Sequence, residues 1–200
     1  DLVRSRGLGD VYKRQDTVLC MIAAEELGVA LEDIEIKRVD TAFTPCDVGT
    51  FGSRVTVLAG DATRMAAADA KRQLLEFAAT RWGVKAEDID IKDGKAFIKS
   101  DPGKSMPFSS LARIAYYAGV NAAIIGRGYD TYEKKPMDIE KGYGYVGVSL
   151  SFTAQEAEVE VDIETGQVRC TDTTIAHDCG RPLNPMAVEG PVSYTHLTLP

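Results

Sequence analysis

The sequence predicts an α/β fold (α+β) in which mixed sheets pack with helices, and three observations support that prediction. Residues 16–29 and 66–83 repeat apolar side chains at the helical spacing, and each run ends near a glycine. Residues 89–99 carry an Asp-Gly turn between two alternating runs. Residues 147–178 alternate again about a second turn, so helical and strand periods follow one another along the chain.

The first helix is expected in the run DTVLCMIAAEELGV, where Asp16 and Thr17 are typical cap residues and Gly28 is a typical stop. One face of this helix carries four apolar residues: Leu19, Cys20, Ala23 and Leu27. The next run, LEDIEIKRVDT at residues 31–41, has the alternation of a strand. We therefore expect a strand there, built around Ile34, Ile36 and Val39.

A second helix is expected after a glycine-rich loop and should end near Gly83. Its apolar stripe is formed by Ala66, Ala67, Ala70, Leu74, Phe77 and Ala78. Its polar face is formed by Asp69, Arg72, Gln73, Glu76 and Thr80. The hairpin follows, with its turn at Asp93 and Gly94, and then a short third helix in PFSSLARIAYYAGV.

Residues 121–145 are rich in glycine, lysine and tyrosine and are expected to form an irregular connection. In the strands that follow, Ala157, Val159, Val161 and Ile163 alternate with Glu156, Glu158, Glu160 and Asp162. A row of glutamates could bind a metal ion, but its strict alternation with an apolar face favours a solvated strand face over a metal site.

Composition excludes several classes of protein. The net charge of −7, from 30 acidic and 23 basic residues, argues against a nucleic-acid-binding surface. No apolar run reaches the length of a membrane span, so a soluble, cytoplasmic protein is expected. The four cysteines form no CxxC pair, which predicts reduced thiols and neither a zinc ribbon nor a disulfide framework.

Both ends of the sequence differ in character from the body at residues 16–190. Residues 1–15, DLVRSRGLGDVYKRQ, lack an initiator Met and any apolar periodicity, and residues 191–200, PVSYTHLTLP, interrupt a promising helix start. Both resemble translated adapter sequence from assembled short reads. We therefore expect residues 1–15 and 191–200 to be non-native tails and the body to be an internal piece of a longer protein.

The segment DVGTFGSRVTVLAGDA, residues 47–62, has the composition of an anion-binding loop. Gly49 and Gly52 allow close approach of the backbone, Thr50 and Ser53 offer hydroxyl groups, and Arg54 offers a planar cation. A helix that begins close by would add positive potential at its N-terminus. The segment is neither a Walker loop nor a GxGxxG fingerprint, so a plain capped turn is the alternative.

A second segment, AHDCGRPLNPMAVEG, joins a strand end to a turn and then to a helix with Asn184 as its expected cap. His177, Asp178 and Cys179 are adjacent there, which suggests a catalytic Cys-His pair. Adjacent strand residues point to opposite faces, so a hydrogen-bonded structural role is the better interpretation of His177.

The runs DTVLCMIAAEELGV, DTAFTPCDVGTFGSRVTVLAGDA, AEVEVDIETGQVR and AHDCGRPLNPMAVEG occur in this order. Together they resemble the molybdenum-binding large subunit of the xanthine dehydrogenase and aldehyde oxidase family, and most closely its hydroxybenzoyl-CoA reductase type. The resemblance covers nearly all of residues 16–190. It implies a fragment of a molybdopterin-binding domain within a two-lobed α/β subunit.

The resemblance also implies cofactors, partners and site residues. The cofactor is molybdopterin with molybdenum, expected as the cytosine dinucleotide, while iron–sulfur clusters and FAD lie on partner subunits or domains. The family oxidises aldehydes or N-heterocycles, or reduces aromatic CoA thioesters. Its phosphate-contacting loop corresponds to Phe51, Gly52, Ser53 and Arg54, and a second pterin-contacting segment reaches Asn184 and Gly190.

The sequence departs from the family pattern at both ends of the body. The family has a glutamine near the molybdenum where this chain has Lys13, Gln15 is out of register, and Pro191 replaces a second glutamine. The catalytic glutamate of the family lies downstream of the matched region. We therefore assign no catalytic or metal-binding residue and expect the fragment alone to be inactive. The alternative is a stand-alone α/β module that binds an anionic ligand without catalysis.

Overall fold

A computed structural model describes residues 15–37, 42, 49, 54–117, 123–129, 137–144, 152–178 and 180–183. The chain divides into two compact units, Asp1–Val148 and Ser149–Pro200. Within the described residues, the first unit contains three α-helices and a three-stranded sheet, and the second contains a two-stranded sheet. All described strand pairs are antiparallel, and the combination of helices with small sheets confirms the predicted class.

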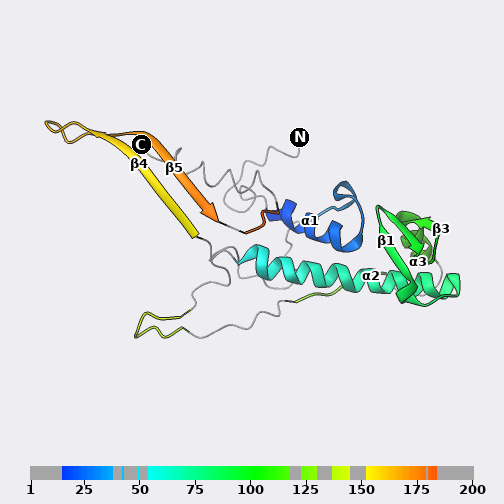
Figure 1. The fold of residues 1–200 in the computed structure, drawn as a ribbon. Helices are drawn as coiled ribbons and strands as arrows, with labels where there is room; N and C mark the ends of the chain where they lie inside the picture. Colours follow the sequence, from blue (N-terminus) through cyan, green and yellow to red (C-terminus); the bar gives the residue numbers. More distant parts are fainter. Residues whose placement is uncertain are drawn as a thin grey trace. The chain divides into compact units, whose positions relative to one another are not determined.

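The first unit is built around helix α2, Gly60–Trp82, which follows directly from a π-helical turn, Val55–Ala59 (Figure 1). Helix α1, Gln15–Leu27, packs along α2, where the Cδ1 atom of Ile22 lies against buried Gly60. Both helices end as predicted, because Gly28 and Gly83 adopt φ of 74° and 68°, a left-handed conformation that costs glycine little.

The sheet of the first unit consists of β1, Ile89–Lys92, β2, Lys95–Ile98, and β3, Asp101–Pro107, in that order. The predicted turn joins β1 and β2, and Asp93 and Gly94 have φ of 50° and 71°, as a two-residue hairpin requires. Helix α3, Phe108–Tyr117, follows as predicted. Strand β3 was not predicted, because DPGKSMP shows no alternation and contains proline and glycine, which are tolerated at an exposed sheet edge.

The core of the first unit lies where α2, α3 and the sheet meet. Ile89 and Leu111 are the largest fully buried side chains among the described residues. The buried cluster as a whole consists of Leu74, Ala78, Ala79, Ile89, Ile91, Ala96, Leu111 and Ala115. Trp82 is partly buried against this cluster at the end of α2. The predicted stripe of α2 therefore faces the core over its second half.

Two expectations for the first unit are corrected by the structure. Leu31–Asp33 forms a 3-10 turn, and residues 34–37 pair with no strand that the structure describes. Ile34 has the extended backbone of a strand, φ −101° and ψ 122°, but alternation alone provides no partner for a ladder. In addition, α1 begins at Gln15, so Asp16 lies inside the first turn and does not precede it as a cap.

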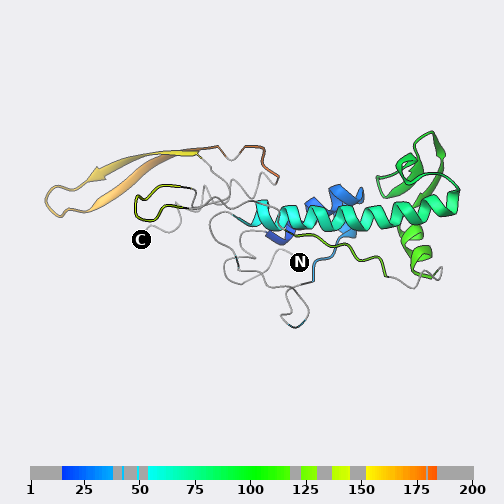
Figure 2. The same cartoon turned by 90° about the horizontal axis from the view of Figure 1, so that it is seen from below.

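The second unit is a hairpin of β4, Phe152–Val161, and β5, Val168–Asp178 (Figure 2). Its strands and turn lie where they were predicted, and Thr171 forms a bulge between the partners Glu158–Asp172 and Val159–Cys170. The solvated glutamate face is confirmed. The opposite face is not covered by any described residue of the unit, however, since Val159 and Val161 are both 53% exposed. A two-stranded sheet has no second layer to cover its apolar face.

Candidate functional site

Of the six residues expected to contact the cofactor, Arg54 is the one that the structure describes. Phe51, Gly52, Ser53, Asn184 and Gly190 lie outside the described residues, as do Cys46 and Cys179. Arg54 is half-buried, and its Nη1 donates a hydrogen bond of 2.7 Å to the backbone oxygen of Gly49. Gly49 has a φ of 94°, so glycine is required at this end of the loop. The guanidinium therefore links two residues of the predicted anion-binding loop, Gly49 and Arg54.

Arg54 also begins a long helical run. Its φ of −81° and ψ of −26° are helical, and its oxygen accepts a 2.7 Å hydrogen bond from the Leu58 N–H. The run continues through the π-helical turn into α2 and ends at Trp82. The first N–H groups of any helix have no acceptors within it, and its dipole is positive at this end. A cationic side chain and a helix N-terminus thus coincide at one place, which is suited to an anion.

The π-helical turn is a feature that sequence reasoning did not predict. Such turns place one extra residue into a helix and often occur at functional sites. Here the turn precedes Gly60, where a Cβ atom would lie 3.0 Å from Ile22 Cδ1. Close packing of Gly60 against α1 holds the start of α2, and with it the backbone on which Arg54 lies.

A groove of about 570 Å³ lies between α1 and α2 near the same helix end. Its lining residues are Ile22, Glu25, Glu26, Thr56, Gly60, Asp61, Arg64 and Lys71. Arg64 pairs with Asp61 at 2.9 Å, and Lys71 pairs with Asp90 at 3.2 Å. The basic groups of the groove are therefore paired with carboxylates, and two further glutamates line it, which makes the groove a poor site for phosphate.

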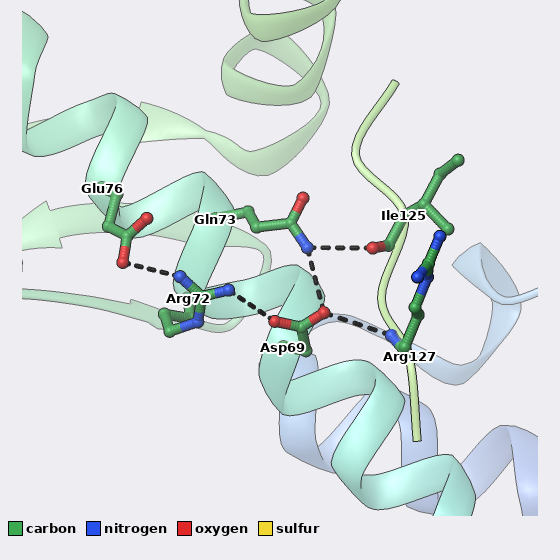
Figure 3. A network of polar contacts seen from close by, with 6 residues as sticks. All are labelled: Asp69, Arg72, Gln73, Glu76, Ile125 and Arg127. Atoms are coloured by element: carbon green, nitrogen blue, oxygen red, sulfur yellow. Dashed lines mark hydrogen bonds and ion pairs between the residues drawn. The ribbon is translucent and has the colours of Figure 1, made fainter. Parts of the chain in front are cut away.

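A polar network on the other side of α2 is the second feature that sequence reasoning missed. Figure 3 shows Asp69, which accepts hydrogen bonds from Arg72 at 2.6 Å, from Gln73 at 3.1 Å and from the backbone N–H of Arg127 at 3.2 Å. Gln73 also donates to the backbone oxygen of Ile125 at 2.9 Å. The hydrogen bond from Arg72, with that from the Arg127 N–H, holds the pKa of Asp69 below its ordinary value of 3.8.

The segment bound by this network is residues 123–129, here called the strap. A Cβ atom at Gly126 or Gly128 would lie 1.9 Å from the backbone oxygen of Ala66 or Ala62, so both positions require glycine. The signal in the sequence is a Gly-x-Gly pair together with alanines at every fourth position of a helix. Nothing in the sequence by itself indicates that these two patterns meet.

The second predicted segment carries His177, whose Nδ1 lies 2.6 Å from the hydroxyl oxygen of Thr153 on the paired strand. This contact agrees with the structural interpretation of His177. The described residues contain no group of three or more His, Cys, Asp or Glu side chains suited to a metal ion. No described helix combines the length and the apolar composition that crossing a membrane requires.

Comparisons with known proteins agree with the resemblance seen in the sequence. Residues 14–193 match the family model described as the molybdopterin cofactor-binding domain. The carbon monoxide dehydrogenase large chain of Hydrogenophaga pseudoflava is 29% identical over 182 residues, which are 88% of this chain and 21% of that protein. The 6-hydroxypseudooxynicotine dehydrogenase complex subunit gamma of Paenarthrobacter nicotinovorans is 31% identical over 178 residues, again 88% of this chain and 21% of that protein.

Solved structures give the same result for the fold. The quinoline 2-oxidoreductase of Pseudomonas putida 86 superposes with a TM-score of 0.71 at 28% identity, over 92% of this chain and 22% of that chain. The chain thus spans about a fifth of the length of the relatives it matches.

Proposed function

The chain belongs to the molybdopterin cofactor-binding domain family, and from this premise we propose that it supplies part of the cofactor cradle in the large subunit of a molybdenum-dependent oxidoreductase. The proposal rests on one observation, the placement of Arg54 at the start of a helical run with its side chain closing the loop at Gly49. The family match argues against the alternative of a stand-alone module without catalysis.

The groups at this turn fit a phosphate of molybdopterin. A guanidinium can donate two parallel hydrogen bonds to phosphate, and the N-terminus of a helix adds N–H donors and positive potential. The hydrogen bond to Gly49 holds the Arg54 side chain in one position, which lowers the entropy lost when an anion binds. Phe51, Gly52 and Ser53 are proposed to complete this loop, and Asn184 and Gly190 a second segment near the pterin.

The chain's own role is to bind and orient the cofactor. When bound, molybdopterin with molybdenum would supply the two-electron redox chemistry that amino-acid side chains lack. None of the described residues is proposed as a catalytic base, and the fragment alone is proposed to be inactive. In the full-length enzyme, Arg54 and the helix N-terminus would keep the phosphate end of the cofactor fixed.

The substrate class and the partner subunits are also proposed from membership of the family. The substrate is proposed to be an aldehyde, an N-heterocycle or an aromatic CoA thioester, and the cofactor to carry the cytosine dinucleotide. Iron–sulfur clusters and FAD are proposed on partner subunits or domains, a pattern compatible with relatives named a large chain and a complex subunit. The likeness to the hydroxybenzoyl-CoA reductase type, the cytoplasmic location and the non-native character of residues 1–15 and 191–200 stay predictions.

The test replaces Arg54 in the full-length protein. Loss of a charge-assisted contact of about 1.5 to 3 kcal/mol would weaken cofactor binding roughly 10- to 150-fold in Arg54→Ala. Arg54→Lys should restore part of this, because an ammonium keeps the charge but not the planar fork. The measurements are molybdenum and pterin content per folded protein after extended dialysis.

The matched control is Arg64→Ala, which removes another arginine from the same helical run. Arg64 pairs with Asp61 on an exposed surface, so its loss should leave the cofactor content unchanged. Full occupancy in Arg54→Ala after dialysis would contradict the phosphate role. Equal losses in the Arg54 and Arg64 variants would show that the effect comes from net charge and not from this site.

A further inference from the structure

The strap runs along α2 in the opposite chain direction. Gly126 meets Ala66 and Ala70, and Gly128 meets Ala62 and Ala66. Two residues of extended chain advance about 6.6 Å, and four residues of helix advance about 6.0 Å. The glycine pair of the strap therefore matches the alanine row of the helix, and the backbones come into contact without intervening side chains.

The strap is held on α2 through its backbone. Asp69 accepts from the N–H of Arg127, and Gln73 donates to the oxygen of Ile125 (Figure 3). The outward side chains contribute little to this contact, since Ile125 is 62% exposed and Tyr129 is 69% exposed. The position of the strap therefore depends on its two glycines, on the hydrogen bonds between its backbone and the side chains of Asp69 and Gln73, and on Ile124, which is partly buried against the core cluster. Arg72 and Gln73, which also donate hydrogen bonds to Asp69, orient its carboxylate.

The strap and α1 hold opposite sides of the first turns of α2. Gly60 faces Ile22 of α1, and Ala62 faces Gly128 of the strap. Residues two apart on a helix point about 200° apart, so the helix lies between these two contacts. Figure 1 shows α1 and the strap on different sides of α2. Ala62 lies about 12 Å along the helix axis from Arg54.

We propose that Asp69 is a positioning residue, which seats the strap on α2 and thereby fixes the first turns of the helix and Arg54 for cofactor binding. The inference rests on the proposed function. Without the strap, α1 would be the one described element left to hold this end of α2, which includes the π-helical turn with its poorer hydrogen-bond geometry. Such a helix end opens more often, and Arg54 would spend less time in the position that binds phosphate.

The experiment compares Asp69→Ala, Asp69→Asn and Gly126→Ala with the control Glu76→Ala in the full-length protein. Glu76 belongs to the same network through its hydrogen bond from Arg72, and this contact does not extend to the strap. Hydrogen exchange is followed in peptides covering residues 123–129, 54–62 and 108–117. Molybdopterin release is followed on dilution.

We expect Asp69→Ala to speed exchange in residues 123–129 and 54–62 by roughly five- to tenfold, with a similar rise in cofactor release. Exchange in residues 108–117 should not change, and Glu76→Ala should behave as the wild type. Asp69→Asn should rescue in part, since an amide oxygen still accepts from the Arg127 N–H. Gly126→Ala tests the same contact by steric exclusion, and if it fails to fold, Asp69→Ala decides, because Asp69 lies outside the buried core.

The inference is overturned if the strap exchanges faster while residues 54–62 and cofactor release keep wild-type rates, since the strap is then only structural. It is also overturned if Asp69→Ala leaves exchange in the strap unchanged. Hydrogen exchange can be measured without bound cofactor, so the proposed function and this inference can be refuted independently of each other. A wild-type protein without molybdopterin would defeat the proposed function, while exchange in residues 54–62 would still decide the coupling.

Discussion

Replacement of Leu111 by alanine tests the described core most directly. Leu111 is fully buried on α3, within the cluster formed with α2 and the sheet. Truncation of a buried leucine to alanine loses transfer free energy and leaves a cavity, at a total cost of about 2 to 5 kcal/mol. With an m-value of about 2 kcal/mol/M in urea, the midpoint of unfolding should fall by about 1 to 2.5 M.

The chain contains its own probe for this measurement. Trp82 is the single tryptophan, and it packs against the same cluster, so its fluorescence reports the unfolding of the first unit. Leu31→Ala is the matched control, because Leu31 is 40% exposed on the 3-10 turn and should change the midpoint little. If Leu111→Ala loses less than about 1 kcal/mol, or no more than Leu31→Ala, the assignment of Leu111 to a close-packed core is refuted.

Two further predictions concern backbone and charge. Gly28→Ala should destabilise the first unit more than Gly83→Ala, although both glycines have positive φ. A Cβ atom at Gly28 would lie 2.1 Å from the backbone oxygen of Ile91, whereas no described atom would lie within 4 Å of a Cβ atom at Gly83. The left-handed conformation alone costs about 1 to 2 kcal/mol, and equal urea midpoints for the two variants would contradict the close approach. Because the pKa of Asp69 is lowered in the folded state, its contribution to stability is complete above its ordinary pKa of 3.8 and is lost as the pH falls through the folded value. Acidification in that range should shift the Arg127 amide resonance in the wild type but not in Asp69→Asn, and a shift of equal size in both would exclude Asp69 as the titrating partner.

The predicted elements that the structure confirms are those that depend on a few neighbouring residues. The glycine stops at Gly28 and Gly83 and the Asp93-Gly94 turn depend on backbone conformations that few residues adopt, so the sequence identifies them without knowledge of contacts. The strand expected at residues 31–41 was wrong for residues 31–37, because a strand exists only with a partner, and alternation does not supply one. The edge strand β3 was missed for the converse reason, since its pairing with β2 outweighs a composition that is poor for strands.

The sequence by itself determined the family, the class of fold and the residue types of the candidate anion site, since each depends on the order and chemistry of neighbouring residues. Only the tertiary structure decided which face of α2 is solvated. Asp69 and Gln73 lie on the polar stripe that the helical period predicts as exposed, yet they bind a segment more than 50 residues away in the sequence. The physical reason is that periodicity describes one element at a time, whereas the match between two glycines and a row of alanines exists only when two elements meet.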